Sequence, residues 1–223
     1  MKALPSISPC GIIPLGMADP AYVPEIAAAV TGSPRHSLLV RTTHWIHTAA
    51  FLGLLVSGIA ILLAHPRLYW GEAGGMGGPS LIDLPLPLVL TGQTGWGRSL
   101  HFLSAWVCIL AGLAYLLSGI VSRHFRDNVF SPGTLYNPIQ RVTYVAVVFG
   151  LFPLVIATGL AMSPAVTSVF PELVALLQGQ QSARTIHFFV AALLFVFLIV
   201  HVTMVVRAGF IHRMRSMLTG EPL

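Results

Sequence analysis

Four continuous apolar stretches constrain this 223-residue chain more than any other feature. Each is about 20 residues long, which is the length that a helix needs to cross a hydrocarbon core of about 30 Å. The strands of a membrane barrel would be shorter and would alternate polar with apolar residues. Only 9% of the residues are charged, too few for the surface of a water-soluble domain. The sequence therefore predicts an all-α integral membrane bundle of four helices, near 40–63, 99–122, 142–163 and 185–206.

The segments outside these stretches complete the expected domain organisation. Residues 1–37 contain six prolines, which interrupt any apolar run and predict an irregular cytoplasmic arm. Residues 38–215 then form the four-helix domain, and residues 216–223 a cytoplasmic tail.

Basic residues predict the orientation of the bundle. Loops on the cytoplasmic side of a membrane carry an excess of Lys and Arg, and nine of the twelve such residues would share one side. Both termini and the middle loop are therefore expected in the cytoplasm, with the bundle among membrane lipids. The same bias explains the basic composition without nucleic-acid binding. The nine are Lys2, Arg35, Arg41, Arg123, Arg126, Arg141, Arg207, Arg213 and Arg215, and the other three are Arg67, Arg98 and Arg184.

Besides His47, four histidines lie inside the expected helices, where ionisable residues are rare and usually functional. His187 and His201 are 14 residues apart on the fourth helix, close to four helical turns, so they share one face roughly 21 Å apart along the axis. His44 enters the first helix at the depth of His201, and His101 enters the second at the depth of His187.

Two imidazoles on facing helices are the axial ligands of a b-type haem in a helix bundle. The depths therefore predict two haems, one held by His44 and His201 on the inner side and one by His101 and His187 on the outer side. His47, about 60° from His44 on the same helix, is the alternative ligand. Zinc would need three or four ligands at one depth.

An arginine stands three residues before three of these histidines, one turn nearer the membrane surface. These residues are expected to bind haem propionates, because a guanidinium can hold a carboxylate through two hydrogen bonds. The alternative is that they are ordinary interfacial arginines. They are Arg41, Arg98 and Arg184.

The histidines stand in motifs that resemble the di-haem cytochrome b subunits of formate dehydrogenases, nickel–iron hydrogenases and thiosulfate reductases, a cytochrome b561 type. The resemblance spans about 38–220. It rests on the sequences Arg41-Thr42-Thr43-His44-Trp45, Gly97-Arg98-Ser99-Leu100-His101, Tyr136-Asn137-Pro138-Ile139-Gln140-Arg141, Ile186-His187 and Val200-His201.

This resemblance implies a function and favours His44 over His47 as the first-helix ligand. It implies electron transfer between a quinone pool and a partner oxidoreductase on the outer side. Quinone would react near the inner haem, beside Asn137, although Asn137 before a proline could equally be a helix cap. The outer loop from His65 to Glu72 resembles cytochromes that accompany molybdopterin oxidoreductases, which implies a molybdopterin-dependent partner.

Two rival functions remain open at the level of sequence. The first is a self-sufficient quinone-linked oxidase of a small outer substrate such as superoxide, as in some short relatives. The second is a non-redox transporter or scaffold whose histidines bind a metal or a proton. If electron transfer requires a partner protein, the first rival is excluded. If the purified protein shows the absorbance of a b-type haem, the second rival is excluded.

Overall fold

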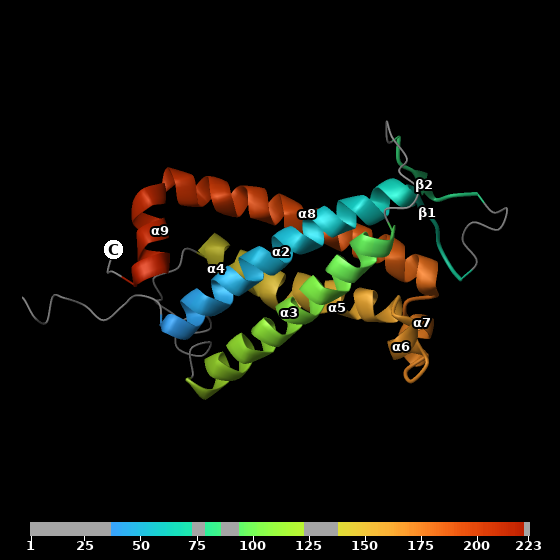
Figure 1. Ribbon diagram of the computed structural model, residues 1–223, viewed down its shortest axis with the longest axis horizontal. Coiled ribbons are helices and arrows are strands. Elements are labelled where there is room, and N and C mark those ends of the chain that lie inside the picture. The colour runs from blue at the N-terminus through green and yellow to red at the C-terminus, as the bar shows by residue number, and fades with distance from the viewer. Residues whose placement is uncertain (1–36, 73–78, 86–93, 123–137, 221–223) are drawn as a thin grey trace, which may run out of the picture.

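The computed structural model describes residues 37–72, 79–85, 94–122 and 138–220. Four long helical segments run side by side along the molecule (Figure 1). Each is long and apolar enough to cross a membrane, so the expected all-α membrane bundle is confirmed. The segments are α2 (Leu38–Ala64), α3 (Thr94–Val121), the third span made of α4 (Pro138–Val145), η2 (Ala146–Leu151) and α5 (Phe152–Ala161), and α8 (Gln180–Arg207).

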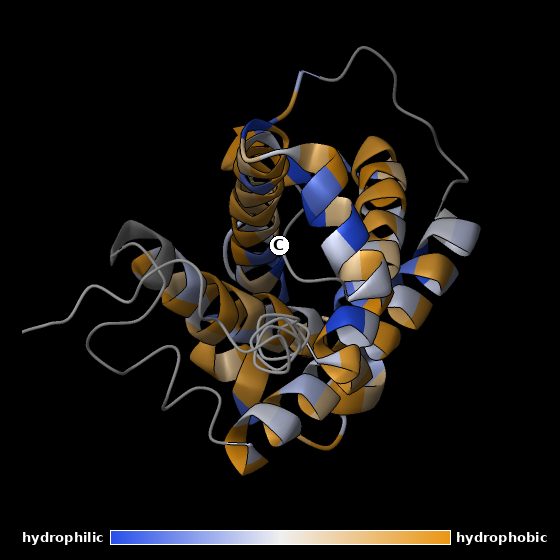
Figure 2. Cartoon of the chain, turned by 90° about the vertical axis from the view of Figure 1, so that its left-hand side faces the viewer, coloured by the Kyte–Doolittle hydropathy of each residue, from blue (hydrophilic) through white to orange (hydrophobic). Residues whose placement is uncertain are grey.

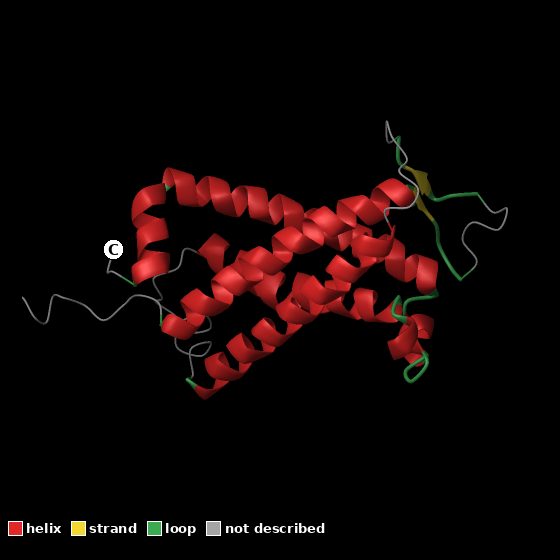
Figure 3. Cartoon of the chain, in the orientation of Figure 1, coloured by secondary structure: helices red, strands yellow, loops and turns green. Residues whose placement is uncertain are grey.

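One end of the bundle, called the hairpin end, carries two short strands and two short helices that connect the spans. Strands β1 (Arg67–Leu68) and β2 (Ile82–Asp83) pair antiparallel, and Figure 3 shows these strands beside the ends of the helices. Helices α6 (Pro164–Thr167) and α7 (Glu172–Leu176) complete this end. In the expected orientation it faces the outside.

The opposite end, called the α9 end, is closed by a short amphipathic helix that the sequence patterns did not predict. Helix α9 (Phe210–Thr219) turns back after α8 and packs against the start of α2 (Figure 1). Arg41 Nη1 donates to the carbonyl of Leu218 at 2.9 Å, and Trp45 Nε1 donates to that of Met217 at 3.2 Å. The expected boundary between bundle and tail at residue 216 thus falls inside a helix.

The third span changes its helical pitch at its middle. Residues Ala146–Leu151 form a π-helical turn, and the N–H of Phe152 donates to the carbonyl of Val147, five residues back. Pro153 follows directly, and a proline ring inside a regular α-helix would clash with the carbonyl four residues earlier. The wider turn relieves this clash, and the expected single helix over 142–163 is therefore three linked pieces over 138–161.

Small residues and a compact apolar cluster hold the spans together. Helix α2 packs along α3, and α5 packs along α8. Gly53 of α2 lies directly against Ser104 of α3. Val147, Val190 and Leu194 form a buried cluster between the third span and α8. Most large apolar side chains instead point outward, as expected for helices surrounded by lipid.

Figure 2 views the bundle from the α9 end and shows how polarity is distributed. The long helices are predominantly hydrophobic on their surfaces, whereas α9 carries a hydrophilic face. Each span contains an 18-residue stretch with a mean hydropathy of at least 2.0 and at most two charged residues. The few polar side chains inside the spans therefore stand out against an apolar background.

Candidate functional site

The first histidine pair lies near the hairpin end, between α3 and α8. His101 is two turns into α3 and His187 two turns into α8, and both rings are largely removed from the surface. Their ring centroids are 6.1 Å apart, with an angle of 59° between the ring planes. The structure thus brings together the two residues that the sequence had matched in depth.

The second pair lies near the α9 end, between α2 and α8. The rings of His44 and His201 have centroids 6.4 Å apart and an interplanar angle of 47°. Phe197, one turn before His201, stacks on that ring at 5.8 Å, and Trp45 meets the His44 ring edge-on at 5.5 Å. His201 is exposed on a membrane-spanning helix, where an uncovered polar ring is costly.

Both pairs have the spacing that a metal ion between two imidazoles requires. A metal–nitrogen bond of about 2 Å on each side places two ring centroids about 6.3 Å apart. The observed separations of 6.1 and 6.4 Å fit this value. Within the described ranges no three His, Cys, Asp or Glu residues gather into a cluster. The donors therefore come in pairs, which suits an iron whose other four ligands belong to a porphyrin.

His47 does not take part in either pair. Its Nδ1 hydrogen-bonds the carbonyl of Thr43 at 2.7 Å, and its ring meets Phe152 of α5 at 6.5 Å. Its Nε2 lies against Gly112 of α3, where an added Cβ would be 3.5 Å away. The ring that the structure places opposite His201 is that of His44.

Comparison with known proteins points in the same direction. A family model described as prokaryotic cytochrome b561 matches residues 35–220, which include all four spans and both histidine pairs. The chain belongs to the prokaryotic cytochrome b561 family. A relative from Azospira oryzae, named as the proposed protein-methionine-sulfoxide reductase subunit YedZ1, is 29% identical over 191 residues, covering 76% of this chain and 89% of the relative. No solved structure matches the chain.

Membership of the cytochrome b561 family defines the general role of the bundle. The chain is a multi-pass bacterial membrane protein that binds b-type haem and transfers electrons. The expectation of a cytochrome b drawn from the histidine motifs is therefore confirmed at the level of the family.

Two hydroxyl groups that sequence reasoning did not single out support the pair at the hairpin end of this cytochrome. Ser57 Oγ lies 3.0 Å from Nδ1 of His101, and Thr158 Oγ1 lies 3.0 Å from Nδ1 of His187. Both hydroxyl residues are fully buried. A serine or threonine in an apolar helix is too common a feature to have drawn attention without its histidine partner.

The three arginines expected near the haem propionates lie at the two ends of the bundle. Arg41 contacts the last turn of α9. Arg184 donates through Nη2 to the carbonyl of His65 at 2.5 Å. Arg98 is exposed in the first turns of α3, close enough to His65 to lower its pKa.

The segment His65–Glu72, called the strap, is hydrogen-bonded to the start of α8. Thr185 Oγ1 donates to the carbonyl of Tyr69 at 2.6 Å, and the N–H of Gly71 donates to Ser182 Oγ at 2.7 Å. The carbonyl of Gly71 accepts from the N–H of Gln181 at 3.0 Å. This strap fixes the turns of α8 that precede His187, so the loop has a structural role at the His101 and His187 pair.

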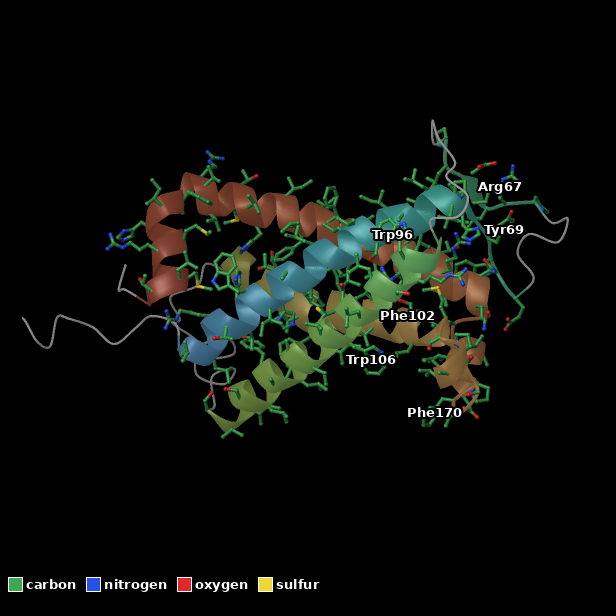
Figure 4. All side chains as sticks on the ribbon, viewed as in Figure 1. Arg67, Tyr69, Trp96, Phe102, Trp106 and Phe170 are labelled. Atoms are coloured by element: carbon green, nitrogen blue, oxygen red, sulfur yellow. The ribbon has the colours of Figure 1, made fainter. Side chains whose placement is uncertain are left out.

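Charged groups at the hairpin end are arranged around this strap. The pKa of His65 is lowered by its partial burial and by the nearby Arg184 and Arg98. The pKa of Arg67 is raised, mainly by Asp83, with which it pairs across the β1–β2 hairpin at 3.1 Å. Figure 4 shows Arg67 and Tyr69 at this extremity of the molecule.

The expected quinone residue, Asn137, lies outside the described residues. Helix α4 begins at Pro138, immediately after it. The start of α4 is at the α9 end of the bundle (Figure 1), the same end as the His44 and His201 pair.

Proposed function

We propose that this cytochrome holds two b-type haems and carries electrons across the bacterial inner membrane between a quinone pool and an oxidoreductase on the outer side. His44 and His201 would hold the inner haem, and His101 and His187 the outer one. In this proposal the α9 end faces the cytoplasm, as the distribution of basic residues favours.

The observation that carries the proposal is the presence of two separate histidine pairs, each spaced for one metal ion, at opposite ends of one membrane bundle. The haem supplies a reversible one-electron carrier at each position. The histidine side chains would supply two nitrogens to each iron and would fix the distance between the two sites. His187 and His201 share α8, so a single helix sets that distance.

The arginines support the proposal through their position one turn outside the histidines. Arg98 and Arg184 lie at the end of the His101 and His187 pair, where they would neutralise the propionates of the outer haem. Arg41 lies one turn before His44 and would do the same for the inner haem while also holding α9.

The name of the Azospira oryzae relative supports a reductase as the outer partner. We propose that the partner is a methionine-sulfoxide reductase subunit that receives electrons from the outer haem, with a molybdopterin centre as the expected acceptor. Electrons would then flow from quinol to the outer side. A self-sufficient oxidase would need no such subunit.

A spectrum of the purified protein tests the core of this proposal. A reduced-minus-oxidised difference spectrum should show the α band of low-spin b-type haem, and the pyridine haemochrome assay should give about two haems per chain. Ubiquinol or menaquinol should reduce both haems. A protein without bound haem would be a transporter or scaffold, and the proposal would be wrong.

The inner ligand can be identified by comparing two neighbouring histidines. Because His44, and not His47, faces His201, we expect His44→Ala to lose the inner haem and His47→Ala to retain both. The haem content of the purified protein should be about one per chain in His44→Ala and about two per chain in His47→Ala. The reverse pattern would assign the inner haem to His47.

The quinone reaction is expected beside the inner haem, at Asn137. Replacing Asn137 with leucine removes a side chain able to hydrogen-bond a quinone carbonyl, which should cost about 1 to 3 kcal/mol, or roughly tenfold to a hundredfold in binding. The measurement is the quinol concentration that half-saturates haem reduction in the purified protein.

Asn128→Leu, a change of the same kind in the same segment between the second and third spans, is the matched control. Haem content should be normal in both variants. If Asn137→Leu bound quinol as tightly as the parent, Asn137 would be only a helix cap, and quinone would react elsewhere.

A further inference from the structure

Each ring of the hairpin-end pair rests against a hydroxyl from a neighbouring helix. Ser57 on α2 is hydrogen-bonded to Nδ1 of His101 on α3, and Thr158 on α5 is hydrogen-bonded to Nδ1 of His187 on α8. Both hydroxyl residues are 0% exposed, so water does not compete for these hydrogen bonds. The two helix pairs thus repeat the same contact on the two sides of one site.

The direction of these hydrogen bonds follows from proton counting. Ser57 Oγ lies 2.6 Å from the carbonyl of Gly53, and a carbonyl can only accept. The single hydroxyl proton is therefore donated to Gly53, and the hydroxyl oxygen accepts from Nδ1–H of His101. Nε2 of His101 then carries the lone pair, as a metal ligand must.

Thr158 repeats this arrangement on the other side of the site. Its Oγ1 lies 2.8 Å from the carbonyl of Leu154 and 3.1 Å from that of Val155. The hydroxyl proton is committed to these carbonyls, so the oxygen accepts from Nδ1–H of His187. Both rings are thereby held as the tautomer whose Nε2 would be available to an iron.

A glycine follows each hydroxyl residue and lies beside the ring. A Cβ added at Gly58 would lie 3.8 Å from Cε1 of His101, and one added at Gly159 would lie 3.4 Å from Cε1 of His187. The dipeptides Ser57-Gly58 and Thr158-Gly159 therefore make equivalent contacts, each with a hydroxyl that accepts from Nδ1–H and a glycine beside the ring.

We propose that Ser57 and Thr158 are positioning residues that fix both outer ligands and lower the reduction potential of the haem between them. A hydrogen-bond acceptor on Nδ1–H makes Nε2 a more basic ligand. A more basic ligand stabilises the more positively charged, oxidised iron, so the potential falls. This inference rests on the proposed ligation by His101 and His187.

The test is a redox titration of the purified holoprotein with each hydroxyl removed. In Ser57→Ala and Thr158→Val the potential of the outer haem should become more positive, and the double variant should shift it furthest. The inner haem should keep its potential. The electron paramagnetic resonance signal of the outer low-spin ferric haem should change with it, because this signal reports the axial ligand field.

Three variants serve as controls. Ser57→Thr and Thr158→Ser keep the hydroxyl and should keep the parental potential and signal. Ser104→Ala removes a buried hydroxyl that packs against Gly53 of α2 and should leave the outer haem unchanged. Loss of the outer haem in the double variant supports the proposal only when both hydroxyl-keeping variants retain the haem, and loss in those variants too overturns it.

An unchanged potential and signal in the double variant, with two haems still bound, would overturn this inference and leave the haem ligation standing. Ser57 and Thr158 would then be helix-packing groups only. The proposed ligation fails by a different result, namely a parent protein without low-spin haem, or a His187→Ala variant that keeps both haems.

Discussion

Replacing His187 with alanine is expected to reduce the haem content from about two to about one per chain. His187 lies opposite His101 with ring centroids 6.1 Å apart, and its ring is fixed by Thr158. The truncation removes the imidazole nitrogen that would bind the iron and the atoms that fill the site. The pyridine haemochrome assay on purified protein measures the loss.

The remaining haem should be the inner one, with an unchanged potential. His212, on α9 and outside the four spans, provides a control, because His212→Ala changes a histidine that belongs to neither pair and should keep two haems. Two low-spin haems in His187→Ala would mean that the shared face of α8 does not supply a ligand to each site.

Replacing Gly53 with valine is expected to lower the free energy of unfolding by about 1 to 3 kcal/mol, the usual cost of overpacking a tight interface. A Cβ at Gly53 would lie 2.5 Å from Oγ of Ser104 and 3.4 Å from its Cβ. Rotation of the Ser104 hydroxyl relieves the clash of a single Cβ, but the two Cγ atoms of valine extend further into the same interface, so α2 and α3 must move apart. Detergent-driven unfolding, followed by helical content, measures the change.

Gly150→Val is the matched control, because a Cβ added at Gly150 meets nothing within 4 Å. Both changes introduce the same β-branched residue into a membrane-spanning helical segment, so the difference between them isolates the contact with Ser104. Equal stability of the two variants would show that α2 and α3 separate at no cost. Because Ser57 lies one turn from Gly53, the outer haem should also be perturbed in the Gly53 variant alone.

Much of the candidate site could be predicted because its geometry lies within single helices. The 14-residue spacing of His187 and His201 fixes their relative direction and distance once α8 is helical. The depth of His44 and His101 follows from where each span enters the membrane. Pairing by depth therefore needs only regular helices and a bilayer of known thickness, and the structure places both pairs accordingly.

Other features depend on packing between helices, which local patterns do not encode. The hydroxyls of Ser57 and Thr158 matter because of the rings opposite them on α3 and α8. Likewise His44 and His47 are both plausible by depth, and only the rotation of α2 about its own axis turns one toward α8 and the other toward Gly112. The docking of α9 onto Arg41 and Trp45 depends on a turn after α8.

The sequence by itself determined that the chain crosses a membrane four times and carries histidines at two depths, because hydrophobic length and helical periodicity are properties of single segments. Tertiary structure alone decided which ring faces which, what hydrogen-bonds to Nδ1, and how α8 is anchored by the strap at its start. Those outcomes depend on the rotation and separation of neighbouring helices, which small residues such as Gly53 and Gly159 set through close contact.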